Sequence, residues 1–157
     1  MATINVDKPP IVKWKDLHAY LSRWQWPNQF ASGAKVCETG GFQATASQTM
    51  SSAPVLAFFF REVILPQGRH TDAVRSFLLC CTVLELLVGA ARGHAAIDEL
   101  AAAVHEHLQT HLDVYGSEWW AFKHHMANRA PEVYRRFKQV VMCWVLERTP
   151  RHQAFHR

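Results

Sequence analysis

Several sequence signals that point to particular functions are absent from this chain of 157 residues. It has no glycine-rich phosphate-binding loop, no G-x-S-x-G nucleophile turn and no H-E-x-x-H zinc pattern. Its four cysteines form no C-x-x-C pair, and its first residues lack the basic and then apolar order of a secretory signal. We therefore expect a reducing compartment, either the nucleus or the cytoplasm.

Long uninterrupted apolar runs are also lacking. The longest candidate, residues 77–91, is interrupted by Thr82 and Glu85 and is shorter than the roughly 20 residues that a bilayer requires. Seven glycines and seven prolines, with 49% apolar and 19% charged residues, exclude collagen-like and disordered chains. The sequence predicts a single helical domain over residues 1–157, with a buried helix at 77–91 and no membrane contact.

Apolar residues recur at three- and four-residue steps along much of the chain, which predicts an all-α fold. Capping residues, glycines and prolines bound the helical segments. We expect an irregular bundle of about six helices. Their expected ranges are Trp14 to Trp24, Ala53 to Ile64, Thr71 to about Gly89, Ile97 to Tyr115, Ser117 to Phe122, and Pro131 to about Glu147.

Two connections are rich in residues that favour turns. The Pro-Gln-Gly sequence at residues 66–68 predicts a tight turn, so the helices on either side should pack as a hairpin. Residues 27–47 contain three glycines and predict a long loop, in which a short β-hairpin around Gly40 and Gly41 is an alternative.

The positive charge is concentrated near the C-terminus. Residues 117–157 have eight basic and three acidic side chains, a net charge of +5, whereas residues 1–116 have nine and ten, a net charge of −1. A local basic surface attracts phosphates and acidic partners, although an ordinary solvated face has the same composition.

Histidines and cysteines are the candidate metal ligands. His107 and His111 are four residues apart on one expected helix, which lets two imidazoles reach one metal, but further donors must come from elsewhere. The alternative is a pair of ordinary histidines at a helix edge. Cys80 and Cys81 point about 100° apart on a helix and are expected in the core.

Glu147 is an isolated acid within the most basic stretch of the chain. Judged by its neighbours alone, it forms a surface ion pair with an adjacent arginine, worth roughly 0–1 kcal/mol.

The last third of the chain also contains an ordered set of residues: Lys123, His125, Pro131, Arg136-Phe137, Cys143 and Glu147-Arg148. In order and spacing these resemble the pattern that closes a group of mobile-element proteins similar to CACTA-type transposases and abundant in dinoflagellate-like genomes. Segments within residues 17–24 and 42–56 are also similar to that group.

This resemblance implies a helical insertion and C-terminal end of a DDE transposase with an RNase H-type nuclease domain. In such enzymes three carboxylates hold two divalent metals, Mg²⁺ or Mn²⁺, and Glu147 takes the place of the third carboxylate. It further implies DNA contacts by the basic residues of this region. These are Lys123, Arg135, Arg136, Lys138, Arg148 and Arg151.

The sequence departs from the pattern at several positions. Arg129 replaces a second histidine, Lys138 replaces a glycine, and Thr149-Pro150 replaces a Lys-His pair. No strand-borne aspartates precede the helices, so Glu147 alone cannot hold two metals. We therefore expect a fragment of a larger transposase, or a decayed or repurposed copy, that is not catalytic alone and uses no cofactor.

Two rival interpretations remain open. One is a helical protein-interaction module that binds through exposed tryptophan and basic residues. The other is a metal-binding helical domain that uses His107 and His111. The sequence does not define an oligomeric state.

Overall fold

The computed structural model describes residues 11–26, 46–94, 96–120 and 122–138, and no strand occurs in these ranges. The all-α prediction is therefore confirmed for the described chain. The predicted loop or hairpin at 27–47 lies almost entirely outside it. The described α-helices are α1 (Trp14–Ser22), α2 (Ala46–Phe59), α3 (Thr71–Ala91), α4 (Ile97–Tyr115) and α5 (Phe122–Phe137).

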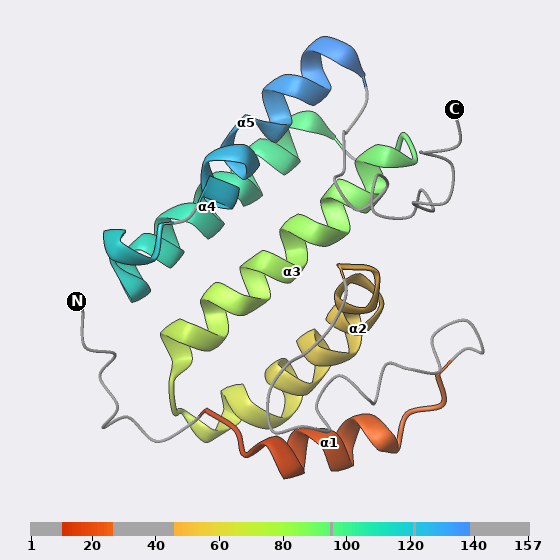
Figure 1. Ribbon diagram of the computed structural model, residues 1–157, viewed down its shortest axis with the longest axis vertical. Helices are drawn as coiled ribbons and strands as arrows, with labels where there is room; N and C mark the ends of the chain where they lie inside the picture. Colours follow the sequence, from red (N-terminus) through yellow and green to blue (C-terminus); the bar gives the residue numbers. More distant parts are fainter. Residues whose placement is uncertain (1–10, 27–45, 95, 121, 139–157) are drawn as a thin grey trace, which may run out of the picture.

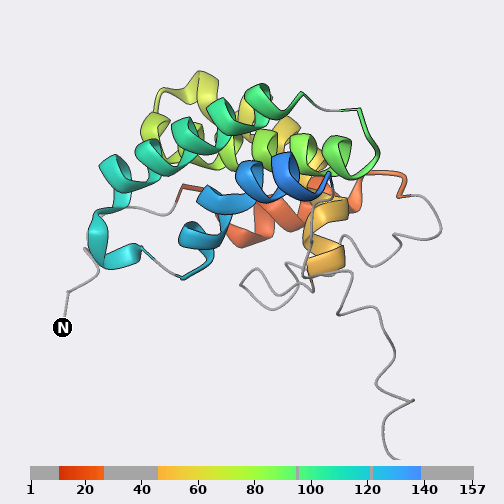
Figure 2. The same ribbon diagram turned by 90° about the horizontal axis from the view of Figure 1, so that it is seen from above.

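Helix α3 lies at the centre of the array (Figure 1). It packs against α2 on one side and against α4 on the other, and α5 packs against α4. Figure 2 shows from above that α4 and α5 run side by side. By length and composition alone, α3 is also apolar enough to cross a membrane. In the structure its neighbours are helices of the same chain.

The core has two main parts. We call the first the aromatic half: its buried residues come from α1, α2, the following turn and the start of α3, and are surrounded by aromatic rings. They are Leu17, Leu21, Leu56, Phe59, Ile64 and Val74. We call the second the aliphatic half, built from the end of α3, α4 and α5. Its buried residues are Val83, Ala90, Leu100, Val104, Leu108 and Tyr134.

Helix α4 follows its predicted bounds. Leu100, Val104 and Leu108 are at four-residue steps and are buried against α3 and α5, as the periodicity predicts. Asp98 lies in the first turn, where the helix dipole favours an acid, and Gly116 follows the last turn with a φ of 83°.

Helix α2 corrects the prediction that a helix begins at Ala53. The chain is already helical from Ala46, and Pro54 lies inside the helix. Ser52, which precedes the predicted start, is buried inside the helix, and its hydroxyl donates to the carbonyl of Gln48 at 2.8 Å. Proline at this position removes one intrahelical hydrogen bond, and packing on both sides of the apolar helix compensates for it.

The end of α2 and the next turn agree with the sequence. A π-helical turn, Phe60–Ile64, and a 3₁₀ turn, Leu65–Gln67, follow α2. Gly68 then adopts a φ of 66°, a left-handed conformation that glycine accepts without a steric penalty. The chain reverses here and α3 returns along α2, so the predicted hairpin is confirmed.

The C-terminal helices correct a second boundary. Instead of one helix ending at Phe122 and another beginning at Pro131, a 3₁₀ turn, Ser117–Trp119, precedes one α-helix that runs through Pro131. Pro131 is buried and Tyr134 is only 9% exposed, so packing on α4 holds the helix together across the proline.

Helix α5 ends earlier than predicted. Lys138, with a φ of 53°, follows its last residue, so the helix predicted to continue to about Glu147 stops at Phe137. The apolar spacing of the last third predicts one shared helix face for Val133, Phe137, Val140, Val141, Trp144 and Val145. Val133 is partly buried, Phe137 is 60% exposed, and the members at positions 140–145 lie outside the described residues.

Candidate nucleic-acid interface

The described basic residues of the predicted DNA-binding set lie at the C-terminal end of α5. Arg135, Arg136 and Lys138 are all exposed there. Lys123 belongs to the first turn of α5, but its side chain is outside the described part of the structure, as are Arg148 and Arg151. The resemblance motif divides in the same way: His125 and Pro131 are described, whereas Cys143 and Glu147 are not.

Arg129 adds a cation that the sequence prediction did not include in the DNA-binding set. It precedes Arg136 by seven residues, close to two helical turns, so both side chains project from the same face. That face is opposite Pro131 and Tyr134, which are buried against the rest of the protein. Helical spacing could have identified Arg129.

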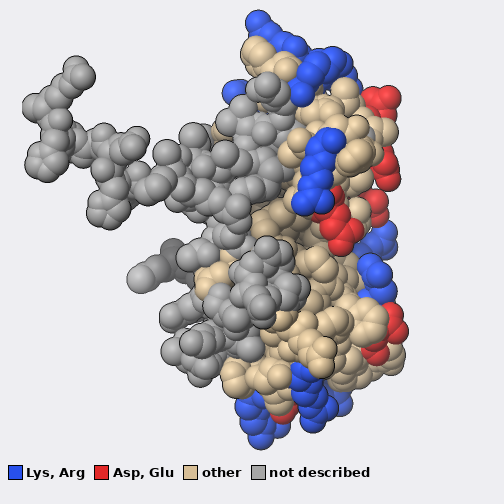
Figure 3. Space-filling model, turned by 90° about the vertical axis from the view of Figure 1, so that its right-hand side faces the viewer, with Lys and Arg blue, Asp and Glu red and all other residues tan. Residues whose placement is uncertain are grey.

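Basic residues outnumber acidic residues along α5. Glu132 is the one acid within α5, against Lys123, three arginines and the adjacent Lys138. Figure 3 shows Lys and Arg gathered at the end of the molecule at the top of the view, and a second group at the opposite end. Cations in the last turn of a helix are also favoured by its negative dipole end, which stabilises this arrangement without any ligand.

The cations differ in their partners. Arg135 pairs with Asp98 of α4 at 3.4 Å, across a well-exposed surface. The guanidinium carbon of Arg136 lies 5.3 Å from the centroid of the Phe137 ring, a cation–π contact. Within the described ranges the other ion pair joins Arg75 to Glu106, so Arg129, Arg136 and Lys138 are paired with no described carboxylate.

A cluster of rings joins the other end of α5 to α4. The ring centroids of His111 and His124 are 4.4 Å apart, and Trp120 stacks on His124 at 5.1 Å. His107 lies 6.1 Å from His111 along α4. The indole Nε1 of Trp120 also donates to Nδ1 of the motif residue His125 at 3.5 Å. The four-residue histidine spacing was visible in the sequence, but the participation of Trp120 and His124 was not.

Burial in this cluster lowers the pKa of both His107 and His111, and the neighbouring imidazoles lower it further. Hydrogen bonds that the ring of His107 donates to the backbone of Ser76, and the ring of His111 to the backbone of Trp119, oppose the shift. Nδ1 of His107 and Nε2 of His111 are buried without a hydrogen-bond partner. Both rings are therefore neutral near pH 7 and add nothing to the positive field.

The described structure adds no further ligand to the predicted metal site at His107 and His111. Within the part of the chain that the structure describes, no group of three or more histidine, cysteine, aspartate or glutamate side chains could hold a metal ion. Cys81 is buried in the core as predicted, whereas Cys80 is only partly buried.

Comparisons with known proteins give no match. No protein-family model, curated protein or solved structure is similar to this chain. The resemblance to CACTA-type transposases therefore stays a prediction based on residues 121–151 and on the shorter upstream segments.

Proposed function

We propose that this chain is a transposon-derived helical domain, non-catalytic by itself, that binds the DNA backbone through the C-terminal end and outer face of α5. The supporting observation is the group of Arg129, Arg136 and Lys138, exposed together and paired with no described carboxylate. Arginine forms two parallel hydrogen bonds with a phosphate, and binding releases the counterions that DNA condenses.

Catalysis is not part of the proposal for the isolated chain. A two-metal nuclease centre needs several carboxylates, and the resemblance assigns only Glu147 to such a set. Mg²⁺ or Mn²⁺ would be held only where a larger DDE site supplies the missing aspartates. On this proposal the domain acts as a DNA-positioning part and works in the nucleus.

Salt-dependent binding to a random-sequence duplex tests the proposal. Fluorescence anisotropy of a labelled duplex should give a log–log salt slope of about −3 if about three phosphates are contacted. The triple variant R129Q/R136Q/K138Q should remove most of that slope.

The matched control removes three exposed basic residues at other positions, K15Q/R61Q/R69Q, and so changes the net charge equally. It should leave most of the slope in place. Equal losses of the salt slope in the two triple variants would indicate a nonspecific effect of net charge. A wild-type affinity that does not change with salt concentration would refute DNA backbone binding.

A helical interaction module is the second candidate, and two exposed aromatic residues favour it. Trp24, two residues after α1, and Phe58 of α2 are 39% and 48% exposed, and their ring centroids are 5.9 Å apart. Exposed neighbouring rings are typical of protein-binding surfaces. Sedimentation velocity of the wild type and W24S/F58S should show salt-insensitive association, lost in the variant, if this surface binds a second copy.

A further inference from the structure

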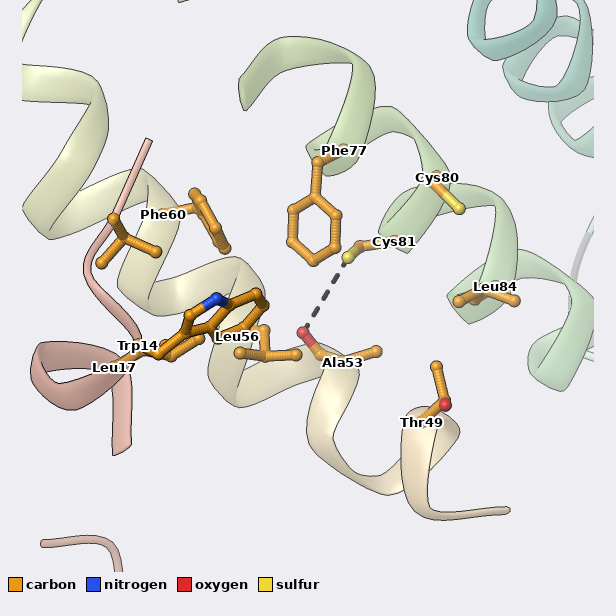
Figure 4. A pocket seen from close by; sticks show the side chains of 11 residues that line it. Trp14, Leu17, Thr49, Ala53, Leu56, Phe60, Phe77, Cys80, Cys81 and Leu84 are labelled. Atoms are coloured by element: carbon orange, nitrogen blue, oxygen red, sulfur yellow. Dashed lines mark hydrogen bonds between the residues drawn. The ribbon is translucent and has the colours of Figure 1, made fainter. Parts of the chain in front are cut away.

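A pocket of about 250 Å³ lies where α1, α2 and α3 meet, away from α5. Figure 4 shows Phe77, Cys81 and Leu84 of α3 on one side and Ala53 and Leu56 of α2 on the other. Trp14 and Leu17 of α1 also line the pocket. It is distinct from every residue of the proposed DNA-binding surface.

Small side chains on α2 create the space. Thr49 and Ala53 are one helical turn apart on the face that meets α3, where larger residues would fill the gap. The helices are held close at one point, where the thiol of Cys81 donates to the carbonyl of Ala53 at 3.9 Å. The described walls of the pocket therefore come mainly from helices, with Val12 added from the segment before α1.

The pocket walls are apolar, with aromatic rings among them. Phe60 and Phe77 lie with ring centroids 4.8 Å apart and planes tilted by 49°. Trp14, which is 41% exposed, adds an indole that reaches both solvent and the pocket. Rings arranged in this way offer faces and edges to a further ring.

The pocket lining offers no charged partner to a ligand and no reactive nucleophile. Among the described residues, no lysine, arginine, histidine, aspartate or glutamate lines the pocket. Burial raises the pKa of the Cys80 thiol, and burial with the nearby Cys80 and Glu85 raises that of Cys81 to about 12. Both thiols stay protonated near pH 7, and a thiol without its thiolate is a poor nucleophile.

We propose that this pocket is a binding site for a neutral, flat aromatic molecule about the size of two fused rings. An apolar cavity of about 150 Å³ is enough to bind benzene. The larger volume and the surrounding Trp14, Phe60 and Phe77 suit a second fused ring. A charged ligand would lose its hydration without gaining a partner.

Isothermal titration calorimetry with 2-naphthol and 2-naphthoate tests the proposal on the full chain, because the two probes share their rings and differ in charge. At pH 7, 2-naphthol should bind with one site, and 2-naphthoate should bind at least about tenfold more weakly. Octan-1-ol, neutral but without rings, should also bind more weakly. Absence of 2-naphthol binding, or equal affinity for the anion, would overturn the site or its chemistry.

Substitution A53L locates the site, since it extends a larger side chain into the pocket. It should weaken 2-naphthol binding by about tenfold or more. The matched control A102L makes the same change at an exposed position of α4 and should leave the affinity unchanged. If A53L loses its helical circular dichroism, T49L narrows the same wall one turn earlier. Undiminished binding to a folded variant of either kind would refute this pocket as the site.

Discussion

The two halves of the core are built differently. In the aliphatic half, Leu100 and Val104 are 0% and 2% exposed and pack at regular helical steps. In the aromatic half, rings such as those of Tyr20 and Phe59, 4.6 Å apart, fill the space, and a pocket remains beside them. Regular aliphatic spacing produces a closed core, whereas bulky rings next to small residues on α2 leave a space.

The largest expected effect comes from truncating one leucine in each half. L100A should lower the free energy of unfolding by about 4 kcal/mol, because a closed site cannot collapse around the missing atoms. L56A should cost about 2 kcal/mol, since its side chain already borders the pocket and loses fewer contacts. Urea denaturation measures both values. An equal or larger loss in L56A would remove the distinction between the two halves.

Acid should weaken the aliphatic half through its histidines. His107 and His111 have a lowered pKa in the folded protein, so as pH falls below about 6.5 the unfolded chain takes up protons that the folded chain resists. Stability should be flat above that pH and fall below it, until the folded-state pKa values are passed.

Thermal unfolding of H107Q/H111Q between pH 7.5 and 5 checks this acid sensitivity. The double variant should lose most of the decline with pH, whatever its stability at pH 7.5. H105Q, an exposed position on the same helix, is the control and should keep the wild-type profile. A wild-type stability that does not change over this range would contradict the histidine mechanism.

A proline substitution probes the aromatic half. P54A restores an amide N–H within α2, where it can bond the carbonyl of Met50, and should stabilise the protein by about 1 kcal/mol. The gain is limited because the unfolded chain becomes more flexible. Calorimetric melting measures it. No gain, or a loss, would indicate that α2 begins near Ala53, as the sequence alone suggested.

The smallest expected effect concerns the exposed ion pairs. Replacing Glu106 by glutamine removes the negative charge from its 3.1 Å contact with Arg75 between α3 and α4, and should change stability by less than about 1 kcal/mol. A double-mutant cycle with R75Q gives the coupling energy. Coupling well above that value would mean that surface charges, and not buried leucines, hold α3 on α4.

The sequence predicted α4 better than it predicted α2 or α5, for a physical reason. The bounds of α4 follow from its regular apolar steps and from Gly116, which are local signals. The starts of α2 and α5 do not follow from local signals. Pro54 and Pro131 are residues normally found near helix starts, and here they lie inside helices that packing holds together. Tertiary contacts that stabilise a helix across a proline have no local signature.

Prediction of the candidate sites was also uneven. The basic end of α5 could be predicted from charge counts, and the His107–His111 pair from its spacing. The pairing of Arg135 with Asp98 joins residues 37 positions apart and depends on α5 lying beside α4. The pocket depends on the facing of small and aromatic residues from three helices, which no single segment reveals.

At Lys138 the requirement for a relaxed backbone conflicts with the requirement for a cation at the proposed DNA surface. Its φ of 53° is a conformation that glycine adopts easily and a lysine resists. The transposase pattern predicted for this region has glycine at that position. Changing Lys138 to glycine would relax the backbone after α5 and remove a cation from the proposed DNA surface. Selection for stability of the fold would therefore favour glycine at this position, whereas selection for phosphate affinity would favour lysine.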